Sequence, residues 1–177
     1  MKSKVHFSLY CKIITVAVIA LFAIGIATTT MEKSTFCLLI VVAALAVATG
    51  LYYCPVCVEA DADSVKIHRL LSRTKEFRYA DIEAADTCYP SAGGIRLCGS
   101  GGFFGYWGYF SDIIIGQYFG YYADRSQCFY IRLKSGRQYV ASCENHVAMA
   151  AAIESHIENI RGTDRGRFNN KVQNSSF

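Results

Sequence analysis

Charged residues and proline are scarce in this sequence. Of its 177 residues, 18% are charged and two are proline, whereas about a quarter of the residues of a soluble domain are charged. The composition excludes a disordered chain, a collagen-like fibre and a highly charged tail that binds nucleic acid. The length allows one ordinary domain with additional segments.

Three familiar site patterns are missing as well. No Gly-Lys-Ser/Thr follows the glycine-rich stretch, which excludes a Walker-type phosphate loop. A dinucleotide-binding fingerprint that begins at Gly99 needs glycine at position 104, where the sequence has Phe104. Cys54 and Cys57 form the only C-x-x-C pair, which supplies half of the ligands of a structural zinc site. The sequence therefore predicts no metal site and no cofactor.

Two long runs without a charged residue occupy the N-terminal part of the chain, Ile13–Met31 and Phe36–Val58. About 20 helical residues cross the hydrocarbon core of a bilayer, and only helices satisfy every backbone group there within one segment. We therefore expect a transmembrane hairpin with helices over about 13–31 and 36–57. A cleaved signal peptide is the alternative for the first run, although that run exceeds the usual apolar region of about 7–15 residues.

Basic residues flank the two runs unevenly. Lys2, Lys4 and Lys12 precede the first run, whereas the link between the runs offers Lys33 alone. Because lysine and arginine favour the cytoplasmic side, we expect both termini to be cytoplasmic. The eight cysteines are then expected to be free thiols, since disulfides are rare in the cytosol.

The net charge of +4 lies at the two ends of the chain. Residues 1–12 contribute three lysines and residues 161–177 contribute four basic residues against one acidic residue, whereas residues 58–160 hold 10 basic and 12 acidic residues. A nucleic-acid-binding domain needs a basic face, so we expect no nucleic-acid partner. The basic ends are expected to lie against anionic lipid or in solvent.

In the rest of the chain, the spacing of apolar residues changes from every second residue to every third or fourth residue. Alternation of apolar and polar residues predicts strands, and Ser135-Gly136 predicts a hairpin turn between the last two. Apolar residues spaced by three and four from Asn145 to Ile160 predict an amphipathic helix that Gly162 ends. The expected class is α+β, a small antiparallel β-barrel plugged by one C-terminal helix. Its strands are expected at 64–70, 75–82, 95–98, 117–122, 128–133 and 138–141.

A glycine- and aromatic-rich segment lies between these strands. Residues 93–120 hold nine of the 14 glycines, and residues 103–122 hold ten aromatic residues. These aromatic side chains either fill the barrel or form an exposed edge that meets the membrane or a partner, as Trp and Tyr do at such boundaries. The candidate contact residues are Phe103, Phe104, Tyr106, Trp107, Tyr109 and Phe110.

Residues 77–83, 93–106 and 108–110, which read FRYADIE, GGIRLCGSGGFFGY and GYF, resemble the signature of a bacterial pleckstrin-homology-like family. The resemblance covers about residues 64–160. It implies a small bent β-barrel capped by a C-terminal helix, in a member of the family anchored in the cell inner membrane. It implies no activity and no catalytic residue.

The sequence is compatible with two functions. The first is a membrane-anchored cytoplasmic interaction module that binds a protein, a peptide or a lipid. The alternative is a membrane-bound enzyme or redox protein that uses Cys54 and Cys57. We predict no enzyme, because the titratable candidates show no nucleophile–base spacing; they are Asp81, Glu83, Asp86, Asp112, Asp124 and His146.

The expected organisation has four parts. Residues 1–12 form a basic cytoplasmic N-terminus, 13–57 the transmembrane hairpin, 58–162 the pleckstrin-homology-like domain and 163–177 a flexible basic tail. Small residues in the second apolar run favour close helix packing, within the hairpin or in a homo-oligomer; they are Ala43, Ala44, Ala46, Ala48 and Gly50.

Overall fold

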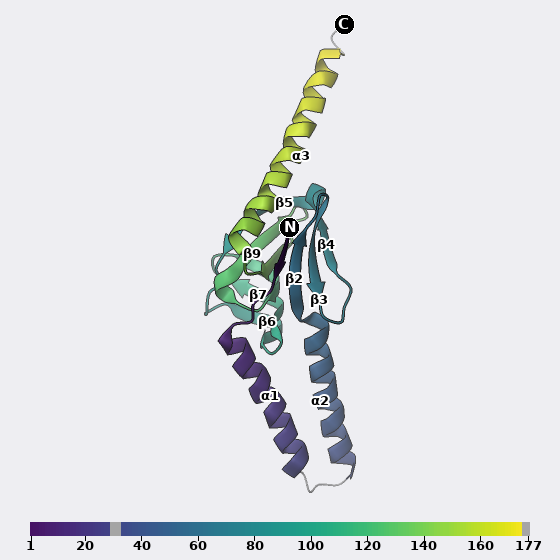
Figure 1. Cartoon of the computed structure of the whole chain (residues 1–177), viewed down its shortest axis with the longest axis vertical. Coiled ribbons are helices and arrows are strands. Elements are labelled where there is room, and N and C mark those ends of the chain that lie inside the picture. The colour runs from purple at the N-terminus through teal and green to yellow at the C-terminus, as the bar shows by residue number, and fades with distance from the viewer. Residues whose placement is uncertain (29–32, 175–177) are drawn as a thin grey trace.

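The computed structural model of the chain describes residues 1–28 and 33–174, with side chains described through residue 162. Two helices, α1 (Leu9–Thr28) and α2 (Lys33–Tyr53), extend from one end of a β-rich domain, and α3 (His146–Asn174) extends from the other end (Figure 1). The predicted α+β class is confirmed. The strands are β1 (Lys2–Lys4), β2 (Pro55–Ala60), β3 (Ser64–Arg69), β4 (Lys75–Arg78), β5 (Ile82–Cys88), β6 (Ile95–Gly102), β7 (Gly105–Asp112), β8 (Gly116–Tyr122), β9 (Cys128–Leu133) and β10 (Gln138–Ser142).

Both N-terminal helices are apolar and mostly exposed. The residues buried in them are Cys11 in α1 and Ala43 and Gly50 in α2, whereas a helix in the core of a soluble protein is mostly buried. Each helix is long and apolar enough to cross a membrane. The structure thus confirms two apolar helices at the predicted place.

Each helix begins before the corresponding apolar run. Ser8 precedes α1, and its Oγ accepts a hydrogen bond from the backbone N–H of Cys11 at 3.3 Å, as an N-cap does. The second helix ends before Cys54 because Pro55 favours an extended conformation for the residue that precedes it. Residues 29–32, which contain the end of the first predicted span, lie outside the described residues.

The strands form two sheets rather than the closed antiparallel barrel expected from the sequence. One sheet has the order β1-β2-β3-β4, and the other has the order β5-β9-β10-β8-β7-β6. The 3-10 turn η1 (Tyr79–Asp81) separates β4 from β5, and no ladder between the described strands joins the two sheets. In addition, β10 returns between β9 and β8 and pairs with β8 in parallel. Alternating hydrophobicity predicts individual strands but not the order in which they pair, which explains both errors.

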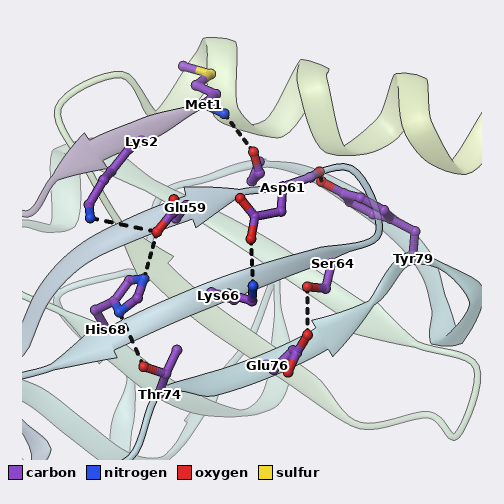
Figure 2. A network of polar contacts seen from close by, with 11 residues as sticks. Met1, Lys2, Glu59, Asp61, Ser64, Lys66, His68, Thr74, Glu76 and Tyr79 are labelled. Carbon is purple, nitrogen blue, oxygen red and sulfur yellow. Dashed lines mark hydrogen bonds and ion pairs between the residues drawn. The ribbon is translucent and has the colours of Figure 1, made fainter.

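The first residues of the chain belong to the four-stranded sheet. Directly before β1, the amino group of Met1 donates to the carbonyl of Ala60 at 2.6 Å, and Lys2 in β1 lies 3.7 Å from the carboxylate of Glu59 (Figure 2). The same carboxylate contacts His68 of β3 at 2.8 Å. Polar contacts therefore join β1, β2 and β3 across the outer face of this sheet.

The four-stranded sheet extends beyond the expected boundary between N-terminus and domain. A domain limited to residues 58–162 omits β1 and the first half of β2. Ser3 is buried, and its Oγ accepts a hydrogen bond from the backbone N–H of Asn145 at 3.2 Å. No apolar alternation marks residues 2–4, so their strand could not be read from the sequence.

The main hydrophobic core lies between the two sheets and beneath the first part of α3. Met149, Ile153 and Ile157 of α3 are buried there, together with Phe129 and Ile131 of β9. The helix continues to Asn174, through the position where Gly162 was expected to end it and through most of the predicted flexible tail. Glycine inside a helix costs only about 1 kcal/mol, so it does not force an end.

Candidate functional site: a glycine–aromatic hairpin between the two N-terminal helices

The segment with the unusual composition forms the hairpin of β6 and β7. These strands pair from Ile95 with Ser111 to Gly102 with Gly105, and Phe103 and Phe104 form the turn. Gly99 and Gly108 face each other in this register with φ angles of 122° and 118°. A Cβ on Gly99 would overlap the carbonyl oxygen of Trp107, so the strands approach too closely for any side chain there.

The tip of the hairpin lies between the domain ends of α1 and α2 (Figure 1). A Cβ built on Gly102 would lie 3.0 Å from a ring carbon of Tyr10 and 3.6 Å from Cβ of Ile14, both in α1. On the other side, a Cβ built on Gly50 of α2 would lie 2.6 Å from Cδ2 of Phe104. Farther along the helices, a Cβ on Gly25 would come within 3.7 Å of Leu39. The two helices therefore meet each other near their connection and meet the hairpin near the domain.

The backbone groups of the tip have internal hydrogen-bond partners. The N–H of Phe104 donates to Oγ1 of Thr15 at 3.0 Å, and the N–H of Phe103 donates to Oγ of Ser100 at 3.0 Å. The carbonyl of Phe103 accepts from the Ser100 hydroxyl at 3.0 Å and from Nε1 of Trp107 at 3.1 Å. These backbone groups therefore need no partner from solvent.

Trp107 joins the hairpin to the end of α2. Its ring stacks on the ring of Tyr53 with centroids 4.8 Å apart and an angle of 11° between the planes. Tyr53 is the last residue of α2, and its ring also lies 6.5 Å from that of Phe119 in β8. The hairpin, the helix end and the six-stranded sheet thus meet at one aromatic cluster.

The six candidate contact residues fall into three groups. Tyr106 and Phe110 are buried in a second core, because they share the inward face of β7. Phe103, Phe104 and Trp107 are half-buried, and the contacts described above tie them to the helices. Tyr109 is 57% exposed. Contact of any of them with lipid or a partner stays a prediction.

The second core is aromatic and links the sheet to α1. Tyr106 stacks on Tyr122 at a centroid distance of 4.8 Å, and the hydroxyls of Tyr118 and Tyr122 lie 3.3 Å apart. Burial raises the pKa of Tyr118 to about 12, so this phenol is neutral at physiological pH. Cys11 at the start of α1 is fully buried in the same core.

Several residues of this site could not be predicted from the sequence. Thr15 and Gly50 lie inside apolar runs, where a hydroxyl and a glycine look like ordinary members of a membrane helix. Gly50 was considered for helix–helix packing, but its open side faces the hairpin. Tyr10 and Tyr53 could have been noticed as aromatic residues at the helix ends, which is typical of membrane boundaries.

Cys54, Cys57 and Asp112, which the sequence offered as candidates for chemistry, have structural surroundings. Cys54 and Cys57 are buried beside the C-terminal end of α2, and no group of three potential metal ligands occurs within the described residues. Asp112 accepts hydrogen bonds from Ser91 and from the backbone of Ile114 and Ile115. Although burial alone raises its pKa, these hydrogen bonds lower the pKa of Asp112 below its usual value. This carboxylate therefore holds a turn.

Comparison with protein-family models, curated proteins and solved structures finds no match to this chain. The resemblance to the bacterial pleckstrin-homology-like family therefore stays a prediction from the quoted residues.

Proposed function

We propose that this protein is a membrane-anchored, cytoplasmic interaction module with a pleckstrin-homology-like domain that binds a protein, a peptide or a lipid at the inner face of the membrane. The observation that carries the proposal is the glycine–aromatic hairpin, which contacts both apolar helices through Gly102, Phe104 and Trp107. Short connections between the domain and each of the two helices add to this attachment. The backbone N–H of Ser8, directly before α1, donates a hydrogen bond to the carbonyl of Ala123 at 3.1 Å. At the other helix, β2 begins two residues after the end of α2. A domain held in this way keeps a fixed orientation relative to the bilayer.

An exposed apolar turn supports a role in binding a protein or peptide. Ile113 and Ile114, between β7 and β8, are 99% and 84% exposed. The turn is rigid, because the buried carboxylate of Asp112 accepts a hydrogen bond from the N–H of Ile114 at 2.8 Å. Apolar side chains that a rigid turn holds in solvent are typical of contact sites.

The redox alternative is less well supported by the surroundings of Cys54 and Cys57. Both side chains are buried, and they follow the C-terminal end of α2, where the helix dipole disfavours a negative charge. Reactive cysteines instead occupy partly exposed, electropositive positions such as helix N-termini. The proposal therefore assigns these two residues a packing role.

Membrane-impermeant thiol labelling of intact cells tests the proposed anchor and its orientation. Cys88 and Cys128 are unsuitable reporters because they are buried, whereas Cys98 in β6 is exposed. In a Cys37→Ser background, we expect Cys98 to react only after permeabilisation, and an added Ser34→Cys at the other end of α2 to react in intact cells. Reaction of Cys98 in intact cells would overturn the orientation. Release of the chain from membranes by alkaline carbonate would overturn the anchor itself.

A further inference from the structure

The loop between β3 and β4, residues 70–74, lies at the same level as the end of α2 (Figure 1). The backbone N–H of Leu70 donates to the carbonyl of Cys54 at 3.0 Å, and Cys54 directly follows the helix. On the other side of the loop, Thr74 Oγ1 lies 3.2 Å from Nδ1 of His68. If α2 crosses a bilayer, this loop lies at the bilayer surface.

The loop combines exposed leucine with unpaired positive charge. Leu70 and Leu71 are 52% and 63% exposed. Arg69, Arg73 and Lys75 flank them, no acidic residue occurs between 69 and 75, and none of the three cations has an ion-pair partner among the described residues. By contrast, Lys66 in the same strand is paired with Asp61 at 2.5 Å. Arg69, Arg73 and Lys75 lie at the helix end of the sheet.

Arg69 holds the loop in a defined shape. Its Nε donates to the carbonyl of Arg73 at 3.1 Å, which closes the loop, and its guanidinium lies 5.8 Å from the ring centre of Tyr52 in α2. The two leucines are therefore presented beside the helix by a fixed backbone. Arg73 itself is exposed, so its side chain is free to meet an anion in front of the loop.

We propose that the β3–β4 loop is a second membrane contact, in which Leu70 and Leu71 enter the headgroup region and Arg73 and Lys75 bind the phosphates of anionic lipids. This inference rests on the proposed anchor, because the anchor places the loop at the bilayer. Apolar side chains of peripheral segments lie about 5–10 Å into the boundary between headgroups and acyl chains. Each lysine or arginine near an anionic surface adds to the attraction. The loop offers both features within seven residues.

Quenching by brominated lipids tests the proposal in the full-length protein. The chain has one tryptophan, Trp107, so Trp107→Phe gives a background for a tryptophan reporter at position 71. The matched control is Ala62→Trp, at an exposed position in the turn at the opposite end of β3. Both variants are reconstituted in nanodiscs with neutral and anionic lipids, and one lipid carries bromine near the headgroup end of its acyl chains.

We expect the emission of the Leu71→Trp variant to fall roughly twofold with brominated lipid, because the reporter lies within the boundary region, and that of Ala62→Trp to stay unchanged. At equal mole fractions, bromine on the anionic lipid should quench more than bromine on the neutral lipid. Replacement of Arg73 and Lys75 by glutamine should remove this difference and leave the thermal unfolding midpoint in place.

Two results would overturn the inference. Unquenched emission of Leu71→Trp in chains that remain in the disc would show that the loop does not touch lipid. Equal quenching by both brominated lipids before the glutamine substitutions would show that the cations do not select anionic headgroups. Loss of every variant from the disc would instead contradict the anchor, and with it the proposed function.

Discussion

Replacement of Gly108 by alanine is expected to lower the midpoint of thermal unfolding by roughly 8–16 °C, which corresponds to about 4 kcal/mol in a domain of this size. Gly108 has a φ angle of 118°, where an L-side chain is strained. Its Cβ would also overlap the carbonyl oxygen of Cys98 and lie 2.7 Å from Cα of Gly99. Both obstacles are backbone atoms of a paired strand, so the new methyl group can fit only if the hairpin separates.

The matched control for Gly108 is Gly136→Ala in the turn between β9 and β10. Gly136 has a φ angle of 80°, but nothing lies within 4 Å of its Cβ position. It therefore reports the cost of the backbone conformation alone, on the order of 1 kcal/mol. Circular dichroism of both variants in detergent checks the prediction. An equal, small loss for both glycines would contradict the close approach of β6 and β7.

Replacement of Phe110 by alanine is expected to cost about 3–5 kcal/mol, as truncation of a buried aromatic side chain does. Phe110 is 5% exposed, and its ring stacks on Tyr118 with centroids 5.6 Å apart. Tyr109→Ala, at the neighbouring exposed position, should cost less than about 1 kcal/mol. Thermal unfolding of the two variants measures this difference. Similar losses at both positions would contradict the assignment of alternate aromatic residues to opposite faces of β7.

The structure of the glycine–aromatic segment could not be predicted from the sequence. Its composition indicated an unusual site, but glycine at every third position from Gly99 to Gly108 fits neither a helix nor a strand pattern, so β7 was not predicted. The structure explains the two ends of this series by close backbone approach, because Gly99 and Gly108 are cross-strand partners. Pairing depends on register between distant residues, which a local pattern does not contain.

Prediction was better where one physical requirement dominated. The apolar runs led to two helices because lipid-exposed segments of that length satisfy their backbone groups in no other way. The Ser135-Gly136 turn was also confirmed, with β9 and β10 paired on either side of it. The six-stranded order and the addition of β1 were missed, since both arise from packing of segments far apart in the sequence. The contacts of Thr15 and Gly50 with the hairpin were missed for the same reason.

The glycine–aromatic hairpin lies between α1 and α2, and a double-mutant cycle of Gly50→Ala and Phe104→Ala tests this placement most directly. In an isolated helix, glycine to alanine stabilises by up to about 1 kcal/mol. Here the added methyl group would lie 2.6 Å from the Phe104 ring, so Gly50→Ala alone should lower the unfolding midpoint of the full-length protein in nanodiscs.

In the Phe104→Ala background, the same Gly50→Ala substitution should be neutral or stabilising, with a coupling of about 1–3 kcal/mol between the two positions. A change of sign of this kind requires that the residues touch. Additive effects of the two substitutions, with Gly50→Ala equally stabilising in both backgrounds, would show that the hairpin does not lie against α2.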